Sequence, residues 1–270
     1  MNNFSPHVSK KILFFNLIFL QIIAMTSCTK KNEPEKKPYT DDIYGVKIRY
    51  VLSIVAAENS LTKDDSISIR NAEVTIVQND SIVTKQVNER GMIYFENLFA
   101  GNTIVNIKCE GYSTANLIVN LALTDTTMID SGNMRIISTI VTLFPTEGES
   151  LAKITGKLLA NTDTTTIENE ILTNQVKIFS IISNDEFFKF IDHSISGGIL
   201  NLNYENITKT TTSNNSGNYE IFVPAALSGL KSYIYANELE ISSKYYYLPK
   251  DSVKSYPFQT IYKDLVFIEK

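Results

Sequence analysis

The chain has 270 residues, of which 43% are hydrophobic and 20% are charged, a composition typical of a folded protein rather than a disordered one. Its net charge is −4, so it lacks the basic surface that nucleic-acid binding requires, and we exclude DNA and RNA as partners. Cysteine and histidine occur only twice each, which argues against a Cys-rich or multi-His metal site, and we expect no metal and no cofactor.

Residues 1–27 have the features of a secretory signal peptide. Lys10 and Lys11 precede a mostly apolar stretch over residues 12–25. Signal-peptide cores run about 7–15 residues, whereas a membrane-spanning helix needs about 20. The stretch is therefore short for a membrane span, and an uncleaved N-terminal anchor helix is the alternative.

The segment Met25-Thr26-Ser27-Cys28 resembles the lipobox of bacterial lipoproteins. The resemblance implies cleavage before Cys28, acylation of its thiol and attachment to a membrane through two or three acyl chains, which hold a protein far more firmly than one. Residues 28–42 are rich in charge and contain two prolines, as expected of a solvated tether. Thr29, in place of an Asp, implies the outer membrane by the same resemblance, but the sequence does not identify the leaflet.

From Tyr44 onward the sequence predicts strands rather than helices. Short runs of β-branched and aromatic residues alternate with clusters of Asn, Asp, Ser and Gly. We therefore expect an all-β protein with two tandem sandwich domains of the seven-stranded type, over residues 43–145 and 151–270. The strands expected in the first domain are 44–57, 72–78, 81–87, 92–96, 102–109, 115–121 and 133–143.

The segment 103–109 shows the two-residue period of a strand clearly. Val105, Ile107 and Cys109 fall on one face, and polar residues fall on the other. Cys109 is therefore expected to point into the core as an inert thiol, because reactivity requires exposure and a lowered pKa.

Residues 88–112 resemble the carboxypeptidase-regulatory-like domains, a transthyretin-like and Cna-B-like family of seven-stranded sandwiches. Ile93 and Thr103 stand where the family has aromatic residues. Gly91 and Gly101 suit turns that need a positive φ. The matching residues are Gly91, Phe95, Leu98, Gly101, Gly111 and Tyr112.

A second unit with a weaker resemblance follows a break at residues 145–149. Residues 154–158 resemble the family's opening strand, and 214–224 resemble its turn-glycine-strand segment. Tyr219, Ile221 and Val223 should alternate inward. Further strands are expected at 230–238, 241–248 and 258–268, and residues 183–212 form an insertion or an extended hairpin.

The sequence offers little catalytic chemistry. His193 is the only histidine after residue 27, and no nucleophile motif surrounds it, so we expect a structural or surface role. Asp41-Asp42 and Asp64-Asp65 could bind Ca²⁺, but neither pair lies in a recognisable calcium loop, and solvated loop acids are the better interpretation. Catalysis by carboxylates alone stays open, because the distance between two carboxylates is not visible in a sequence.

Tyr246 is the one expected contact surface. In the strand Tyr245-Tyr246-Tyr247, the outer two residues share one face and Tyr246 takes the other. Tyrosine suits wet interfaces, so Tyr246 could contact a sugar or a protein; the alternative is that it covers a sheet edge.

These features predict a non-enzymatic outer-membrane lipoprotein that binds or scaffolds through β-sandwich domains. Its expected partners are the membrane, through the lipid on Cys28, and a protein or glycan ligand that the sequence does not identify. The alternatives are a fimbrial-type subunit that polymerises by donating a strand and an accessory component of a glycan-uptake system. An accessory hydrolase is the third class, and no motif supports it.

Overall fold

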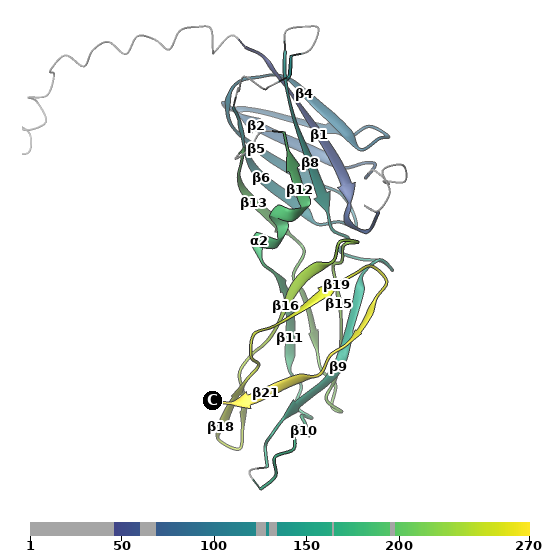
Figure 1. Cartoon of the computed structure of the whole chain (residues 1–270), viewed down its shortest axis with the longest axis vertical. Coiled ribbons are helices and arrows are strands. Elements are labelled where there is room, and N and C mark those ends of the chain that lie inside the picture. Colours follow the sequence, from purple (N-terminus) through teal and green to yellow (C-terminus); the bar gives the residue numbers. More distant parts are fainter. Residues whose placement is uncertain (1–45, 60–68, 123–127, 130–133, 164, 195–197) are drawn as a thin grey trace, which may run out of the picture. The chain divides into compact units, whose positions relative to one another are not determined.

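The computed structural model describes residues 46–59, 69–122, 128–129, 134–163, 165–194 and 198–270, and residues 46–270 belong to one compact unit (Figure 1). The predicted signal peptide, Cys28 and the tether lie outside the described residues. Among the described residues, no helix is both long and hydrophobic enough to cross a membrane.

The first sandwich consists of two five-stranded sheets. One has the order β12-β8-β1-β4, with β7 paired to β8, and the other has the order β13-β6-β5-β2-β3. Strand β1 shows why the sequence folds this way, because every second residue from Ile48 to Ala56 is buried. The strands of the first sandwich are β1 (Ile48–Ala56), β2 (Glu73–Gln78), β3 (Ser81–Gln86), β4 (Met92–Leu98), β5 (Gly101–Lys108), β6 (Thr114–Leu121), β7 (Met128–Ile129), β8 (Arg135–Leu143), β12 (Ile191–His193) and β13 (Ile199–Glu205). The 3₁₀ helix η1 (Ala57–Asn59) follows β1.

The second sandwich consists of a seven-stranded and a four-stranded sheet. The first of these has the order β10-β9-β21-β18-β17, with β15 and β20 also paired to β9, and the other has the order β14-β11-β16-β19. Its strands are β9 (Ala152–Ala160), β10 (Glu170–Ile171), β11 (Lys177–Ile182), β14 (Lys209–Thr212), β15 (Asn218–Val223), β16 (Leu230–Ala236), β17 (Leu239–Ile241), β18 (Lys244–Tyr247), β19 (Asp251–Ser255), β20 (Thr260–Tyr262) and β21 (Leu265–Glu269).

The two sandwiches share one topology. In each, the opening strand pairs antiparallel with the strand after the turn glycine, β1 with β4 and β9 with β15. Each opening strand also pairs in parallel with the last part of its sandwich, β1 with β8 and β9 with β20 and β21. The second sheets correspond strand by strand, β3-β2-β5-β6 to β14-β11-β16-β19. The all-β sandwich fold expected from the sequence is confirmed.

The same turn precedes β4 and β15. The side-chain oxygen of Asn88 accepts from the backbone N–H groups of Arg90 and Met92, and that of Asn214 accepts from those of Ser216 and Asn218. The glycine in each turn has a positive φ, +66° at Gly91 and +70° at Gly217. Asparagine fits here because its amide can satisfy nearby backbone donors.

Residues 183–208 interrupt a hairpin of the second sandwich and contribute strands to the first. They lie between β11 and β14, which pair with each other. Within this segment β12 pairs with β8, and β13 pairs with β6. The helical turns α2 (Asn184–Phe187) and η2 (Phe188–Phe190) precede these strands. The domain boundary near 145–151 stays a prediction, but strands from both sides of it share the sheets of the first sandwich.

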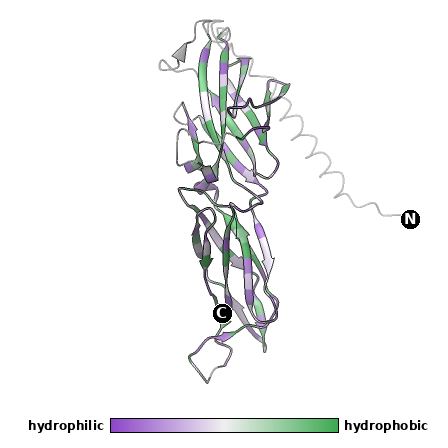
Figure 2. Ribbon diagram, turned by 90° about the vertical axis from the view of Figure 1, so that its right-hand side faces the viewer, coloured by the Kyte–Doolittle hydropathy of each residue, from purple (hydrophilic) through white to green (hydrophobic). Residues whose placement is uncertain are grey.

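The expected buried faces are confirmed on the strands that carry the family resemblance. Phe95 is 2% exposed, and Tyr219, Ile221 and Val223 are all buried. Figure 2 shows the resulting alternation of hydrophilic and hydrophobic residues along the strands.

Two strands predicted near the C-terminus are wrong in their extent. The stretch 241–248 is split by a tight turn at Ser242 and Ser243, both of which have a positive φ, so that β17 and β18 form a hairpin. The stretch 258–268 is interrupted at Lys263 and Asp264, between β20 and β21. Serine at positive φ gives a weaker sequence signal than glycine, so the first turn was missed.

Candidate binding surface

A chain of three polar side chains fixes the position of His193 in β12. The hydroxyl of Tyr50 donates to Oγ1 of Thr139 over 2.8 Å, and Oγ1 of Thr139 lies 2.5 Å from Nδ1 of His193. Burial lowers the pKa of His193, against the opposing effect of Asp192, and burial raises the pKa of Tyr50. A neutral imidazole that accepts at Nδ1 fits this chain of hydrogen bonds, whereas Nε2 is buried without a hydrogen-bond partner among the described residues.

Cys109 lies just beyond the end of β5 and is partly buried. It packs against the core of the first sandwich, and its Sγ lies 3.9 Å from the backbone oxygen of Arg70. Burial, with a smaller effect from Glu110, raises the pKa of this thiol. A raised pKa keeps the thiol protonated and weakly nucleophilic.

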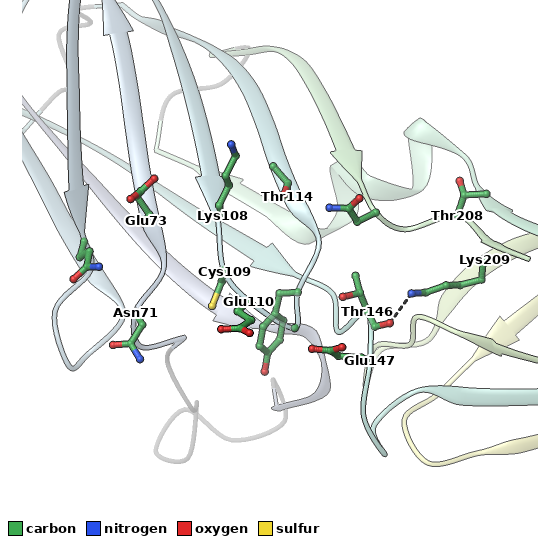
Figure 3. Close-up of a pocket in the computed structure, with 14 residues that line it drawn as sticks. Asn71, Glu73, Lys108, Cys109, Glu110, Thr114, Thr146, Glu147, Thr208 and Lys209 are labelled. Atoms are coloured by element: carbon green, nitrogen blue, oxygen red, sulfur yellow. Dashed lines mark hydrogen bonds between the residues drawn. The ribbon is translucent and has the colours of Figure 1, made fainter.

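An open groove of about 810 Å³ lies beside Cys109 (Figure 3). Five separate parts of the chain line it, and three of these are residues 108–112 with Thr114 at the β5–β6 connection, Thr146 and Glu147 after β8, and Asn206, Thr208 and Lys209 up to the start of β14. Glu73 and Gln86 contribute from β2 and β3. The return of the chain from β13 to β14 past the end of the first sandwich therefore supplies one part of the groove.

The groove is lined mainly by charged and polar side chains. Glu73 faces Lys108 across the β2–β5 pair, and Glu110 and Glu147 lie further along (Figure 3). The ammonium of Lys209 donates to the backbone oxygen of Thr146. Burial lowers the pKa of Lys209, while Glu147 opposes that shift. The groove carries both acidic and basic groups, with Glu110 and Glu147 between Lys108 and Lys209, so it suits a polar ligand rather than a strongly charged one.

Tyr112 and Gly111 shape the floor of the groove. The Tyr112 hydroxyl donates to Glu58 over 2.7 Å, and both burial and this carboxylate raise the pKa of Tyr112. Gly111 has a φ of +78°, and a Cβ there would lie 3.4 Å from the Glu147 carboxylate. The Gly-Tyr pair of the predicted motif therefore has a structural reason, namely a left-handed turn and an anchored ring.

The sequence predicted none of this as a site. Cys109, Gly111 and Tyr112 stood out only as parts of a fold motif, and the groove's other residues come from distant segments. No spacing pattern connects them, because their proximity is produced by strand pairing.

The prediction that Tyr246 forms a contact surface is wrong. Tyr246 is 1% exposed and packs in the core of the second sandwich, whereas Tyr245 and Tyr247 are 52% and 37% exposed. The alternation along the strand is as expected, but the inward face is the opposite one. A strand with three identical residues gives no signal for which face is buried.

The other predicted positions lie outside the described residues. These are the lipidation site Cys28 and the acid pairs Asp41-Asp42 and Asp64-Asp65. Within the described ranges, no group of three or more His, Cys, Asp or Glu side chains is arranged to hold a metal ion.

The sequence matches no known family model and no curated protein. Solved structures with a similar fold include the shaft pilin SpaA from Lactobacillus rhamnosus GG, at 12% identity over 83% of this chain and 98% of that chain, with a TM-score of 0.28. The minor pilin GBS52 of Streptococcus agalactiae is 9% identical over 83% of this chain and 96% of that chain, with a TM-score of 0.41. A streptococcal ancillary pilin is 12% identical over 82% of this chain and 62% of that chain, with a TM-score of 0.34. With identities and TM-scores this low, these likenesses carry no conclusion about this chain.

Proposed function

We propose that the chain is a lipid-anchored, non-catalytic protein of the outer membrane whose β-sandwiches bind or scaffold another component of the cell envelope. The anchor rests on the sequence, in which an apolar stretch over residues 12–25 ends at Thr26-Ser27-Cys28. Acylation of Cys28 would keep the sandwiches at a membrane surface, because several acyl chains bury enough hydrocarbon for stable attachment.

The groove beside Cys109 is the observation that carries the binding role. It is open, polar and built from five segments that strand pairing brings together. The thiol of Cys109, beside the groove, has a raised pKa. His193, the one histidine beyond residue 27, is held in β12 by Thr139. Among the residues that the structure describes, neither group is paired with a partner that would activate it, which favours binding over turnover.

Labelling and fractionation test the anchor. Radiolabelled palmitate should enter the wild-type chain in a bacterial host, and Cys28→Ala should abolish labelling and move the protein out of the membrane fraction. Equal labelling of both chains would contradict lipidation at Cys28.

Capture from the envelope tests the binding role. The full-length chain in detergent should retain a component of solubilised envelope, and Glu147→Lys should weaken retention by placing a second ammonium beside Lys209. Glu168→Lys, an exposed change in a loop outside the groove, is the matched control. Hydrolysis of a glycan or peptide substrate that is lost with one Asp or Glu substitution would contradict a non-catalytic role.

A fimbrial-type subunit is the second candidate, and one observation favours it. Residues 183–208 leave the second sandwich and supply β12 to one sheet of the first sandwich and β13 to the other. The same strand addition between two chains would join subunits in a row.

If the chain works in this way, purified protein at high concentration should form linear polymers visible by electron microscopy. Chains that stay monomeric under all conditions would leave the binding module as the better function.

A further inference from the structure

The outward face of the sheet β13-β6-β5-β2-β3 carries an unusual concentration of asparagine. Asparagine is depleted in strands, because its side chain favours turns and loops. All six of these side chains are exposed or only partly buried, so core packing does not explain them. They are Asn102 and Asn106 on β5, Asn116 and Asn120 on β6, and Asn201 and Asn203 on β13.

Strand register aligns five of these amides in two rows across the sheet, whereas Asn201 lies opposite Ile118. Asn102 pairs with Asn120 in one row, and Asn106, Asn116 and Asn203 pair in the other. In the longer row Asn106 donates to Oδ1 of Asn116 over 2.5 Å, and Asn116 donates to Glu205 over 3.0 Å. Each amide has two N–H donors and a carbonyl with two lone pairs, so these bonds orient the side chains and leave capacity for a ligand.

An aliphatic row lies between the two amide rows. Ile82, Val77, Ile104 and Ile118 are opposite one another on β3, β2, β5 and β6. Ile82 is 69% exposed and Ile104 is 51% exposed. The face therefore presents an amide row, an aliphatic row and a second amide row, with neighbouring residues of a row about 5 Å apart.

The next row on the same face is charged and borders the groove. It contains Gln86, Glu73 and Lys108, which are opposite one another on β3, β2 and β5 and also line the groove beside Cys109. At the same end of the sheet Glu205, which accepts from Asn116, lies opposite Thr114 on β6. The neutral rows and the groove are thus parts of one continuous surface.

We propose that this asparagine face, with its central aliphatic row, binds a neutral polysaccharide chain. A sugar ring carries hydroxyl groups around its edge and C–H groups on its faces. The amides can donate to and accept from the hydroxyls, and the aliphatic row offers apolar contact to the C–H groups. The two amide rows and the aliphatic row contain no charged residue, so the face complements an uncharged chain. This inference deepens the proposed binding role by naming its ligand class, and it rests on that role.

Other partners fit the face less well. The side chains that dominate protein interfaces are Trp, Tyr and Arg, and these three rows contain none of them. A nucleic acid would need a row of basic side chains, whereas Lys108 lies opposite the acidic Glu73 in the strand register.

Affinity electrophoresis of the full-length chain in detergent tests the proposal. Gels would contain dextran, mannan, xylan, galactan or mixed-linkage glucan as neutral probes, and alginate or polygalacturonate as acidic ones. At least one neutral probe should retard the chain, and the double variant Asn106→Ala with Asn116→Ala should weaken that retardation at least tenfold. The double variant Thr210→Ala with Thr212→Ala is the control, because it removes two exposed polar residues from an edge strand of a different sheet.

Two further measurements keep the result interpretable. Ile104→Lys places a charge in the aliphatic row and should also abolish retardation. This variant tests the same face independently if the asparagine variants unfold. The side-chain amide NMR signals of Asn106 and Asn116 should shift when an oligosaccharide of the retarding polymer is added.

The proposal is overturned if no neutral polymer retards the chain, if only acidic polymers do, or if folded asparagine variants bind as tightly as wild type. These outcomes are separate from a failure of the proposed function. A chain that captures an envelope protein but no glycan would keep its binding role and lose this ligand, whereas a chain that captures nothing would lose both.

Discussion

Two equivalent hairpins in this molecule have very different connections. In the first sandwich, β2 and β3 are joined by Asn79 and Asp80, both with a positive φ, as in a type I′ turn. In the second sandwich, the corresponding strands β11 and β14 are separated by residues 183–208. The comparison shows that a hairpin can keep its pairing while its connection extends the sheets of a neighbouring sandwich.

The difference also changes which core a residue stabilises. Phe187 follows β11 of the second sandwich in sequence, but it packs in the core of the first sandwich. Its ring centroid lies 4.6 Å from that of Tyr204 and 5.8 Å from that of Phe144. Core membership is therefore decided by strand pairing and not by position along the chain.

The largest expected effect comes from removing this ring. Phe187→Ala should destabilise the first sandwich by about 3–5 kcal/mol, because Phe187 is 1% exposed and the variant leaves a cavity. Denaturant unfolding monitored by NMR or hydrogen exchange would show whether the loss is in the first sandwich. The neighbouring Phe188→Ala is the matched control, since that ring is 46% exposed. Equal losses of unfolding free energy in Phe187→Ala and Phe188→Ala would contradict the assignment of Phe187 to the core of the first sandwich.

A smaller loss is expected in the second sandwich at Gly156. A Cβ at this position of β9 would lie 2.0 Å from the backbone oxygen of Lys263, so the connection between β20 and β21 would have to move. Gly156→Ala should cost about 1–3 kcal/mol, as overpacking usually does. Thermal unfolding would measure the effect, with the exposed Lys157→Ala as control. If Gly156→Ala melted at the wild-type temperature, the β20–β21 connection would move without cost, and the predicted destabilisation would be wrong.

The attachment of β12 should depend on pH. Burial holds the pKa of His193 below its usual value of about 6.5, so in mild acid the native state binds fewer protons than the unfolded chain. The contribution of His193 is therefore complete above about pH 6.5 and is lost as the pH falls below that value. Unfolding free energies at pH 7.5 and 5.5 should differ less in His193→Gln than in wild type, and an unchanged difference would contradict this role.

The smallest effect on stability is expected on the asparagine face. Asn106→Ala and Asn116→Ala should each change the unfolding free energy by no more than about 0.5 kcal/mol, because neither side chain lies in the core. Chemical unfolding checks this directly. A loss as large as that of Phe187→Ala would show that the asparagine rows stabilise the sheet, and their presence would then need no ligand.

The sequence by itself determined most of the strands, the turn glycines and the buried faces. Short runs of β-branched and aromatic residues identified β1 to β6 and β8, and the resemblance to a turn-glycine-strand segment identified the starts of β4 and β15. These features are local, because a strand shows its buried face in consecutive residues and a turn shows its backbone demand in one or two.

Only the tertiary structure decided the pairings between distant segments. It assigned β12 and β13 to the first sandwich, placed Tyr246 inward, and formed the groove and the asparagine rows. Pairing partners far apart in sequence leave no local signal, and three consecutive tyrosines present the same pattern whichever face is buried. The burial of Tyr246 and the alignment of Asn106 with Asn116 and Asn203 are both consequences of register, which the folded sheets alone define.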